Sequence, residues 1–368
     1  MSTSLIPLSE CNRAHAKREY DDGKKFLLSY PRALFIELTR TCNLHCPMCR
    51  SADVQNTGKQ MSRSLFDRIA SEIFPYAELV DLRGWGESLI LPQFPNLARK
   101  TARQGCDVRI VSNMSFQRDE VLELLSDLRA YVGISIDSAD PELLNELRGG
   151  ADLERIRSNC KKLASLYERH GSSSRLNLYV TCQRPALSDL EDLIDFADDV
   201  GIRDVRLAPV RLEDDNPACL SHVPQEVRAM LDRVRGRAER LGVNVSLTAS
   251  LFEGQRPNRS NHACSHPWYY CTITYDGRVG FCDHLNGPEG DRYTMGDLSE
   301  SSFREIWNCK EWVDLREEHL GPRRESAPYF DECAWCYRNR HVDTEDMIEP
   351  EFSEERAFVH RSDVAMLH

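Results

Sequence analysis

Three cysteines, Cys42, Cys46 and Cys49, lie within eight positions directly after an apolar run, in the stretch TCNLHCPMCR. Thiolates three and four residues apart in one tight loop can bind three corners of an iron–sulfur cube. A zinc knuckle is the alternative, but zinc needs a fourth ligand and the nearby His45 lies within the turn itself. With three protein ligands, one coordination position stays open for chemistry.

Six further cysteines lie from residue 264 to residue 336, so the thiols gather at two places in the chain. A disulfide framework is typical of short secreted chains, whereas this chain has 368 residues. Two groups of thiols therefore suggest two metal sites in a reducing compartment. The scattered cysteines fit ordinary buried thiols instead, namely Cys11, Cys106, Cys160, Cys182 and Cys219.

The composition excludes some classes of protein. Hydrophobic residues make up 41% of the chain and charged residues 29%, and no apolar run is long enough to span a bilayer. The N-terminal residues lack the sustained apolar core of a secretion signal, so we expect a cytoplasmic protein with no membrane partner. The net charge of −12 argues against a nucleic-acid partner, which would need a dense basic surface.

The elements that must position the first cysteines alternate between strand-like and helix-like segments. Short apolar runs predict strands over 33–39, 78–85, 107–113, 131–137, 176–182 and 204–210. Helical spacing of apolar residues predicts helices over 62–77, 94–105, 119–128, 141–148, 152–170 and 187–201. Six β/α repeats favour parallel strands with right-handed crossovers. Because a closed TIM barrel needs eight, we expect an α/β fold with an open, partial (β/α)6 barrel.

The remaining sequence predicts a second, smaller unit. A helix over 224–242 and a strand-like run over 243–248 lead to a cysteine-rich α+β domain, with a β-hairpin around Asp276 and Gly277 and a helix over 301–321. The expected boundaries are an N-terminal extension, the barrel, a helical linker, the cysteine-rich domain and a C-terminal tail, over 1–30, 31–215, 216–256, 257–340 and 341–368 respectively.

The cysteine loop after the first strand of a β/α repeat resembles that of the radical SAM superfamily. In that family the open iron is bound by the amino and carboxylate groups of S-adenosylmethionine (SAM). Reductive cleavage of SAM then gives a 5′-deoxyadenosyl radical, which abstracts a hydrogen atom from the substrate. Met48, directly before the third cysteine, matches the bulky residue that packs near the adenine.

Three further motifs follow in the order of this family, each at the carboxyl end of a predicted strand. RGWGES resembles the Gly-Gly-Glu motif that meets the SAM amino group, although Trp85 stands where the family usually has a small residue. VSNMS resembles a Thr-Asn-Gly turn near the ribose or the substrate, and ISID resembles a Ser-hydrophobic-Asp motif at the same mouth. Singly, a serine could end a strand and an aspartate could cap a helix. The matching positions are Gly84, Gly86, Glu87, Ser112, Asn113, Ser135 and Asp137.

The later cysteines resemble the SPASM/Twitch extension of radical SAM enzymes. The shared pattern is Cys-x2-Pro-Trp, Asp-Gly, a second cysteine, a Gly-Asp-Leu turn, Ile-Trp-Asn and a terminal Cys-x2-Cys. No cysteine follows Cys336, which favours the single-cluster Twitch form over a full SPASM domain, and a four-cysteine zinc site is the alternative. The resemblance implies an auxiliary [4Fe–4S] cluster, in addition to the SAM-binding one, held by Cys264, Cys282, Cys333 and Cys336.

The resemblance to Twitch enzymes implies a reaction on a small sugar or aminocyclitol, of the kind found in aminoglycoside antibiotic biosynthesis. We expect an oxidoreductase that converts an alcohol into a ketone, with the auxiliary cluster accepting the second electron. A flavodoxin or ferredoxin is the expected electron donor. Arg184 and Arg206, near the ends of the fifth and sixth strands, are candidates for contact with the substrate, for proton transfer or for the SAM carboxylate. Either arginine could equally form a surface salt bridge.

Other functions stay open at this point. An epimerase would return hydrogen from a thiol, with Cys271 as the first candidate, although Cys271 could equally be a buried strand residue. Cys309 is expected to be a packing residue on a helix. A peptide-modifying maturase is less favoured, because only about thirty residues precede the first strand, too few for a peptide-recognition domain. A non-catalytic iron–sulfur or zinc protein is the remaining alternative.

Overall fold

The computed structural model describes residues 6–49, 57–212, 215–251, 264–283, 285, 293–321, 333, 335–337 and 357–359. In chain order the strands are β1 (Ala33–Ile36), β2 (Leu79–Asp81), β3 (Asp107–Ser112), β4 (Tyr131–Ser135), β5 (Leu176–Cys182), β6 (Asp204–Pro209), β7 (Asn244–Leu247), β8 (Tyr270–Ile273), β9 (Arg278–Gly280), β10 (Thr294–Asp297) and β11 (Ala357–Val359). They form one sheet in the order β10-β9-β8-β1-β2-β3-β4-β5-β6-β7-β11.

The partial barrel consists of parallel strands that follow one another in chain order. Each strand from β1 to β7 pairs in parallel with the next. The six predicted strands are all present, which confirms the expected partial TIM barrel. The strand-like run after residue 242 forms β7, a seventh parallel strand beside β6. The carboxyl ends of all these strands therefore meet at one edge of the sheet, where ligands bind in such folds.

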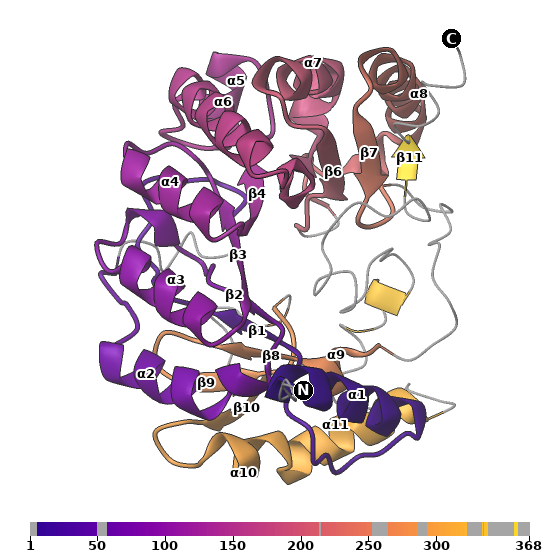
Figure 1. Cartoon of the computed structure of the whole chain (residues 1–368). Helices are drawn as coiled ribbons and strands as arrows, with labels where there is room; N and C mark the ends of the chain where they lie inside the picture. The colour runs from indigo at the N-terminus through magenta and orange to yellow at the C-terminus, as the bar shows by residue number, and fades with distance from the viewer. Residues whose placement is uncertain are drawn as a thin grey trace.

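Helices cover the outer face of the strands in an arc, which Figure 1 shows. They begin and end at residues suited to those positions. The side chains of Asp140 and Asp152 accept hydrogen bonds from the first turns of their helices, and Gly201 and Gly242 end theirs with a positive φ. The helices of the arc are α2 (Arg63–Glu72), α3 (Phe94–Arg103), α4 (Asp119–Asp127), α5 (Pro141–Leu147), α6 (Leu153–Arg169), α7 (Leu190–Val200) and α8 (Pro224–Leu241).

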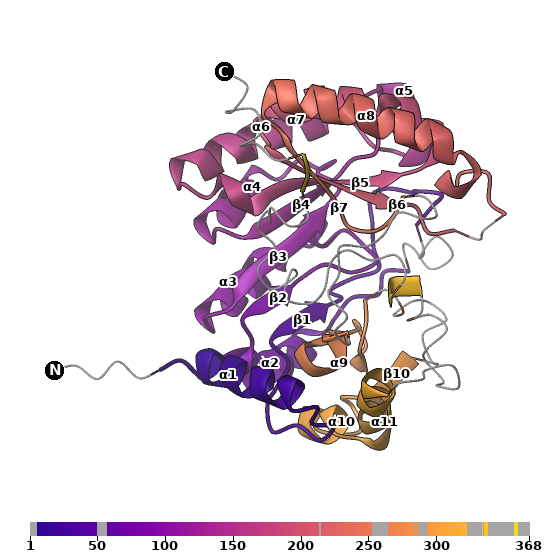
Figure 2. The same cartoon turned by 90° about the vertical axis from the view of Figure 1, so that its right-hand side faces the viewer.

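The cysteine-rich region continues the sheet of the barrel. Strand β8 pairs in parallel with β1, and the predicted hairpin is present as the antiparallel pair β8 and β9. Gly277 turns this hairpin with a φ of +98°, a conformation that favours glycine. Three helices of this region lie near one another at the end of the sheet far from α8 (Figure 2): α9 (His266–Tyr269), α10 (Phe303–Trp307) and α11 (Lys310–Leu320).

Segments near both termini pack on the sheet. Helix α1 (Leu8–Asp21) brings the Tyr20 ring to 5.3 Å from that of Trp268 in α9, measured between centroids. Three residues of the expected C-terminal tail form β11, which pairs antiparallel with β7, and the other residues of 341–368 lie outside the described part. In the part of the chain that is described, no helix combines the length and the apolar character that a bilayer span requires.

Candidate active site

The first three cysteines lie in the loop that follows β1, at the carboxyl edge of the sheet. His45 N donates to the Gly149 carbonyl at 2.8 Å, which ties the loop down, while the His45 side chain is exposed. Burial, together with the negative charges of Glu87, Cys46 and Cys49, raises the pKa of Cys42 to about 12. Thiols this close deprotonate together only when metal neutralises them. The three therefore fit an iron–sulfur cluster with one open iron.

The RGWGES loop packs directly on the cysteine loop. Glu87 N donates to the Thr41 carbonyl at 2.9 Å. A Cβ atom on Gly86 would lie 2.3 Å from the same carbonyl oxygen, and one on Gly84 would lie 2.7 Å from the Glu37 Cγ atom. Only glycine allows the two loops to approach so closely. The structure thus gives the predicted glycines a role in placing the cysteine loop against the end of β2.

Glu87 joins the ends of β2 and β3 to this loop. Its carboxylate accepts hydrogen bonds from Leu89 N at 3.1 Å and Asn113 N at 2.9 Å, and burial raises its pKa to about 7. Asn113 Nδ2 donates to Asn43 Oδ1 at 3.0 Å and lies 3.9 Å from Cys42 Sγ. The two predicted residues Glu87 and Asn113 therefore lie next to the cysteine loop.

The end of β4 adds a buried ion pair between the predicted Asp137 and Arg148, which sequence reasoning missed. Asp137 is fully buried and accepts two hydrogen bonds from the Arg148 guanidinium, at 2.8 and 3.0 Å. Arg148 lines a cavity together with the predicted Ser135 and with Cys46 and Cys49. Asp137 therefore orients a cation beside the cluster thiols. A guanidinium and a hydroxyl in this place can hold a carboxylate such as that of SAM.

The cavity has a volume of about 370 Å³, within the range of sites for small ligands. Its wall includes the predicted Met48 and side chains from β3 to β6. Three arginines line it, Arg83, Arg148 and Arg211, whereas no Asp or Glu is among the described lining residues. Trp335, which lies between the last two cysteines of the chain, also lines it, so the cavity extends from the first cysteine loop to the Cys-x2-Cys motif.

A chain of ion pairs extends from Arg83, in this wall, into the barrel interior. Arg83 Nε lies 2.9 Å from Asp81 Oδ2, and its Nη2 lies 3.2 Å from Asp283 Oδ2. Burial disfavours the charged form of Arg83, but these two carboxylates outweigh it and hold the pKa of Arg83 above its usual value. Arg109 Nε lies 3.6 Å from the same Asp81 oxygen. The barrel interior is therefore charged rather than apolar at this level.

The predicted residue Arg206 belongs to this charged interior. Its guanidinium lies 2.9 Å from Asp204 Oδ2 and donates to Tyr179 Oη at 3.4 Å. Tyr179 lines the cavity, so Arg206 acts on the cavity through this tyrosine. Sequence reasoning missed Tyr179, although the burial of β5 alternates from Leu178 to Cys182 and marks the face on which Tyr179 lies.

Three other predicted residues lie away from the cavity wall. Arg184 is exposed, at the start of a short 3-10 helix after β5. Ser112 is buried and accepts a hydrogen bond from Met114 N at 3.1 Å, which shapes the turn after β3. Cys271 is fully buried on β8, opposite Leu34 of β1 in the hydrophobic core. Cys271 therefore has the environment of a packing residue.

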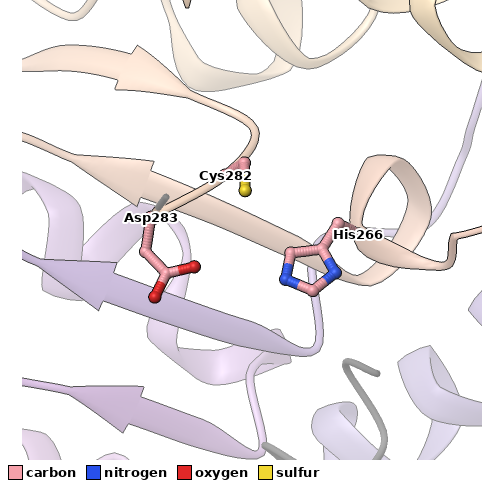
Figure 3. A group of neighbouring side chains, drawn as sticks. All are labelled: His266, Cys282 and Asp283. Atoms are coloured by element: carbon pink, nitrogen blue, oxygen red, sulfur yellow. The ribbon is translucent and has the colours of Figure 1, made fainter. Parts of the chain in front are cut away.

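Two of the later thiols lie next to His266, which sequence reasoning also missed. Cys264 Sγ lies 3.4 Å from His266 Nδ1. The ligand atoms of His266, Cys282 and Asp283 all lie within 4.8 Å of one another, and Figure 3 shows the ring and the thiol of this group. Residues 264 and 282, far apart in the chain, are thus brought to one place.

Tyr337 connects the first of these thiols with the last two. Its hydroxyl accepts a hydrogen bond from Cys264 N at 2.8 Å and lies 2.7 Å from His319 Nδ1. His319 Nε2 lies 4.0 Å from Cys333 Sγ, and Cys336 directly precedes Tyr337 in one helical segment. These contacts place Cys264, Cys282 and Cys333 near His266, Tyr337 and His319. Together with Cys336 they would supply the four thiols of an iron–sulfur cluster without an open position.

Comparisons with known proteins agree with these two sites. The radical SAM superfamily matches residues 36–197, and the iron–sulfur cluster-binding SPASM domain matches residues 264–337. The AdoMet-dependent heme synthase of Methanosarcina barkeri is 23% identical over 350 residues, covering 87% of this chain and 95% of that protein. The mycofactocin maturase MftC of Mycobacterium ulcerans is 26% identical over 321 residues, covering 83% of this chain and 82% of the maturase.

Solved structures share the fold. Streptococcus suis SuiB, bound to its precursor peptide SuiA, superimposes with a TM-score of 0.61 at 16% identity, over 92% of this chain and 76% of SuiB. The enzyme anSMEcpe with bound AdoMet and a peptide gives a TM-score of 0.61 at 14% identity, over 84% of this chain and 89% of that one. The chain therefore contains a radical SAM domain followed by a SPASM domain, and these domains imply S-adenosylmethionine, a [4Fe–4S] cluster and auxiliary iron–sulfur clusters as cofactors.

Proposed function

We propose that the protein oxidises an alcohol carbon of a small substrate that carries a carboxylate or phosphate group. When bound, SAM and its cluster supply a radical that removes a hydrogen atom from carbon, and the auxiliary cluster accepts an electron. The observation that carries this proposal is the shared cavity, which is lined by Cys46 and Cys49 at one side and by Trp335 of the Cys-x2-Cys motif at another. A substrate held there would lie beside Cys46 and Cys49 and against Trp335 of the Cys-x2-Cys motif.

The charge of the cavity wall supports an anionic substrate. Arg148 lies beside the cluster thiols and suits the SAM carboxylate, which leaves Arg83 and Arg211 for the substrate. Guanidinium groups bind carboxylates and phosphates through paired hydrogen bonds. An aminocyclitol, the class expected from the sequence, carries a positive charge. Carboxylates pair with Arg83 and Arg148, so it is the guanidinium donors in the wall, rather than a net positive charge, that favour an anionic group over an ammonium group. Sugar acids and sugar phosphates keep the expected hydroxyl groups and carry such an anionic group.

The thiols in the cavity favour oxidation over epimerisation. An epimerase needs a hydrogen-atom donor that faces the substrate. Among the described residues that line the cavity, the thiols are Cys46 and Cys49, which hold the cluster. Cys271, the expected donor, is fully buried in the core, and this burial raises its pKa well above the usual value.

The size of the cavity supports a small molecule. About 370 Å³ must accommodate part of SAM as well as the substrate. The name of the Methanosarcina relative, a heme synthase, refers to a cofactor. A second relative is the tungsten-containing aldehyde ferredoxin oxidoreductase cofactor-modifying protein of Pyrococcus furiosus. It is 26% identical over 326 residues, which cover 82% of this chain and 88% of that protein. These names support a small molecule as the substrate of a protein with this fold.

The experiment starts from protein reconstituted anaerobically to about eight irons per chain, the content of two [4Fe–4S] clusters. Reduced enzyme and SAM are incubated with glucuronate, with glucose 6-phosphate and with the aminocyclitol 2-deoxy-scyllo-inosamine. We expect substrate-dependent 5′-deoxyadenosine and a product lighter by two hydrogens from an anionic compound. Product from the aminocyclitol alone would contradict the charge assignment. A product of unchanged mass that gains deuterium from the buffer would indicate epimerisation.

A further inference from the structure

Tyr179 occupies a position that the proposed oxidation leaves without a role. Its side chain projects from β5 into the barrel and lines the cavity. The neighbouring strand leaves room for the ring because it has glycine at this level. A Cβ atom on Gly133 of β4 would lie 2.5 Å from the Tyr179 Cδ2 atom. The ring is therefore confined between adjacent strands, with its hydroxyl among the charged groups of the interior.

The Tyr179 hydroxyl oxygen accepts two hydrogen bonds from cations. Arg109 Nη2 of β3 donates to it at 2.8 Å, and Arg206 Nη1 of β6 donates to it at 3.4 Å. A guanidinium has donors and no acceptor, so neither contact can take the proton of the phenol. The hydroxyl group must therefore either donate its proton to a third group or be ionised. Two charge-assisted donors on one oxygen favour the phenolate.

The charges around the hydroxyl come from several strands. Arg83, which follows β2, adds a third cation, and the carboxylates paired with these arginines are those of Asp81, Asp204 and Asp283. Burial raises the pKa of Tyr179, but the charges of Arg109, Arg206 and Arg83 outweigh it and lower this pKa to about 8. A phenol with such a pKa can exchange a proton near neutral pH.

We propose that Tyr179 is the proton acceptor of the oxidation, and that its phenolate oxygen takes the proton of the substrate hydroxyl group. This assignment rests on the proposed function. An alcohol carbon that becomes a carbonyl loses a hydrogen atom, a proton and an electron. The hydrogen atom goes to the radical from SAM, the proton to Tyr179 Oη, and the electron to the auxiliary cluster. Tyr179 then releases its proton to solvent when the product leaves.

The geometry also explains why Arg206 is placed behind the cavity wall. It stabilises the negative charge on Tyr179 and is itself held by Asp204 at 2.9 Å. Arg206 is then a positioning residue, and Tyr179 is the catalytic residue that touches the substrate. Replacing Arg206 by Lys keeps a charge but removes the fixed fork geometry.

The first test needs no substrate. Reconstituted enzyme with bound SAM is titrated with base, and the near-ultraviolet absorbance of tyrosinate is recorded for wild type, for Tyr179→Phe and for Tyr131→Phe. Tyr131 is the matched control, because its ring also lies under a guanidinium, Arg175 at 4.2 Å. We expect one tyrosine to titrate near pH 8 in wild type and Tyr131→Phe, and this step to be missing in Tyr179→Phe. If Tyr179→Phe titrates like wild type, the proposal is overturned.

The second test uses glucuronate as the probe. General-base removal typically costs about a hundredfold or more in rate. We expect Tyr179→Phe to lose product at least to this extent. Replacement of Tyr179 by 3-fluorotyrosine, a stronger acid, should move the rising limb of the pH profile to lower pH. Full product formation by Tyr179→Phe, or a profile that 3-fluorotyrosine does not move, would overturn the assignment.

The two tests separate this inference from the proposed function. If the titration step belongs to Tyr179 but wild type oxidises neither glucuronate nor glucose 6-phosphate, the proposed substrate class is wrong and the phenolate assignment stands. If wild type forms the oxidised product and Tyr179→Phe does so equally fast, the proposed function stands and Tyr179 is not the acceptor.

Discussion

Arg83 and Asp283 lie 200 residues apart in the chain, yet the Arg83 Nη2 atom lies 3.2 Å from the Asp283 Oδ2 atom. The pair joins Arg83, at the wall of the cavity, to the residue that follows Cys282, a predicted auxiliary ligand. The substrate cavity and the auxiliary site are therefore parts of one charged interior.

The first prediction concerns this ion pair. Arg83→Gln leaves the buried carboxylates of Asp81 and Asp283 without their shared cation, which typically costs about 3 to 5 kcal/mol. We expect a large loss of stability in denaturant unfolding of the reconstituted protein. Arg83→Gln combined with Asp283→Asn should recover part of this loss, since one charge is removed with its partner. Additive effects of the two changes would show that the pair does not couple.

The second prediction concerns the glycine beneath the cysteine loop. Gly86→Ala places a Cβ atom 2.3 Å from the Thr41 carbonyl oxygen, so the loop must move. We expect the iron content to fall by about half, to that of one [4Fe–4S] cluster, and SAM cleavage to be lost. Gly236→Ala is the control, because its Cβ would lie 3.5 Å from the flexible end of Arg240. Normal iron content in Gly86→Ala would contradict the packing argument.

The third prediction concerns the histidine beside the auxiliary thiols. If His266 Nδ1 carries the proton, it donates to Cys264 Sγ and stabilises the reduced cluster. One hydrogen bond contributes about 1 kcal/mol, which for one electron is on the order of 40 mV. His266→Leu should lower the auxiliary reduction potential in an EPR-monitored titration by this amount, and His266→Gln should lower it less. The exposed His170 provides a control, and a His170→Leu shift of equal size would refute the local effect.

The fourth prediction concerns pH and stability. The pKa of Tyr179 is lowered to about 8 in the folded protein, against about 10 in an unfolded chain. Between these values the unfolded state binds more protons, so this group makes stability rise with pH. We expect the stability difference between wild type and Tyr179→Phe to grow in favour of wild type from about pH 8 to about pH 10. A constant difference, measured by denaturant unfolding, would mean that the hydroxyl is not ionised.

Much of the fold and of the two metal sites was predictable because the signals are local. The spacing of Cys42, Cys46 and Cys49 indicates a loop with three ligands, and the alternation of strand and helix patterns indicates a partial barrel. The polar motifs at strand ends fall at one edge by the geometry of a parallel sheet. The strand-like run over 243–248, placed in a linker by the expected boundaries, forms β7, the seventh parallel strand of the barrel.

Which residues lie at the cavity depends on tertiary structure and could not be predicted from the sequence. Arg184 and Arg206 have the same residue type and both follow strand patterns, yet Arg184 is exposed and Arg206 is buried beside Tyr179. Cys271 lies close in sequence to cluster ligands, but its pairing with β1 places it in the core.

The cofactor chemistry was therefore predictable from the sequence, because short spacings indicate which thiols can share a metal and the order of the motifs resembles that of radical SAM enzymes. The charges of the substrate site depended on tertiary structure, because Arg83, Arg148 and Tyr179 come from distant parts of the chain. Periodicity assigns a side chain to one face of its own strand. Which side chains meet across that face depends on strand order and register, and these follow from the packing of the whole barrel.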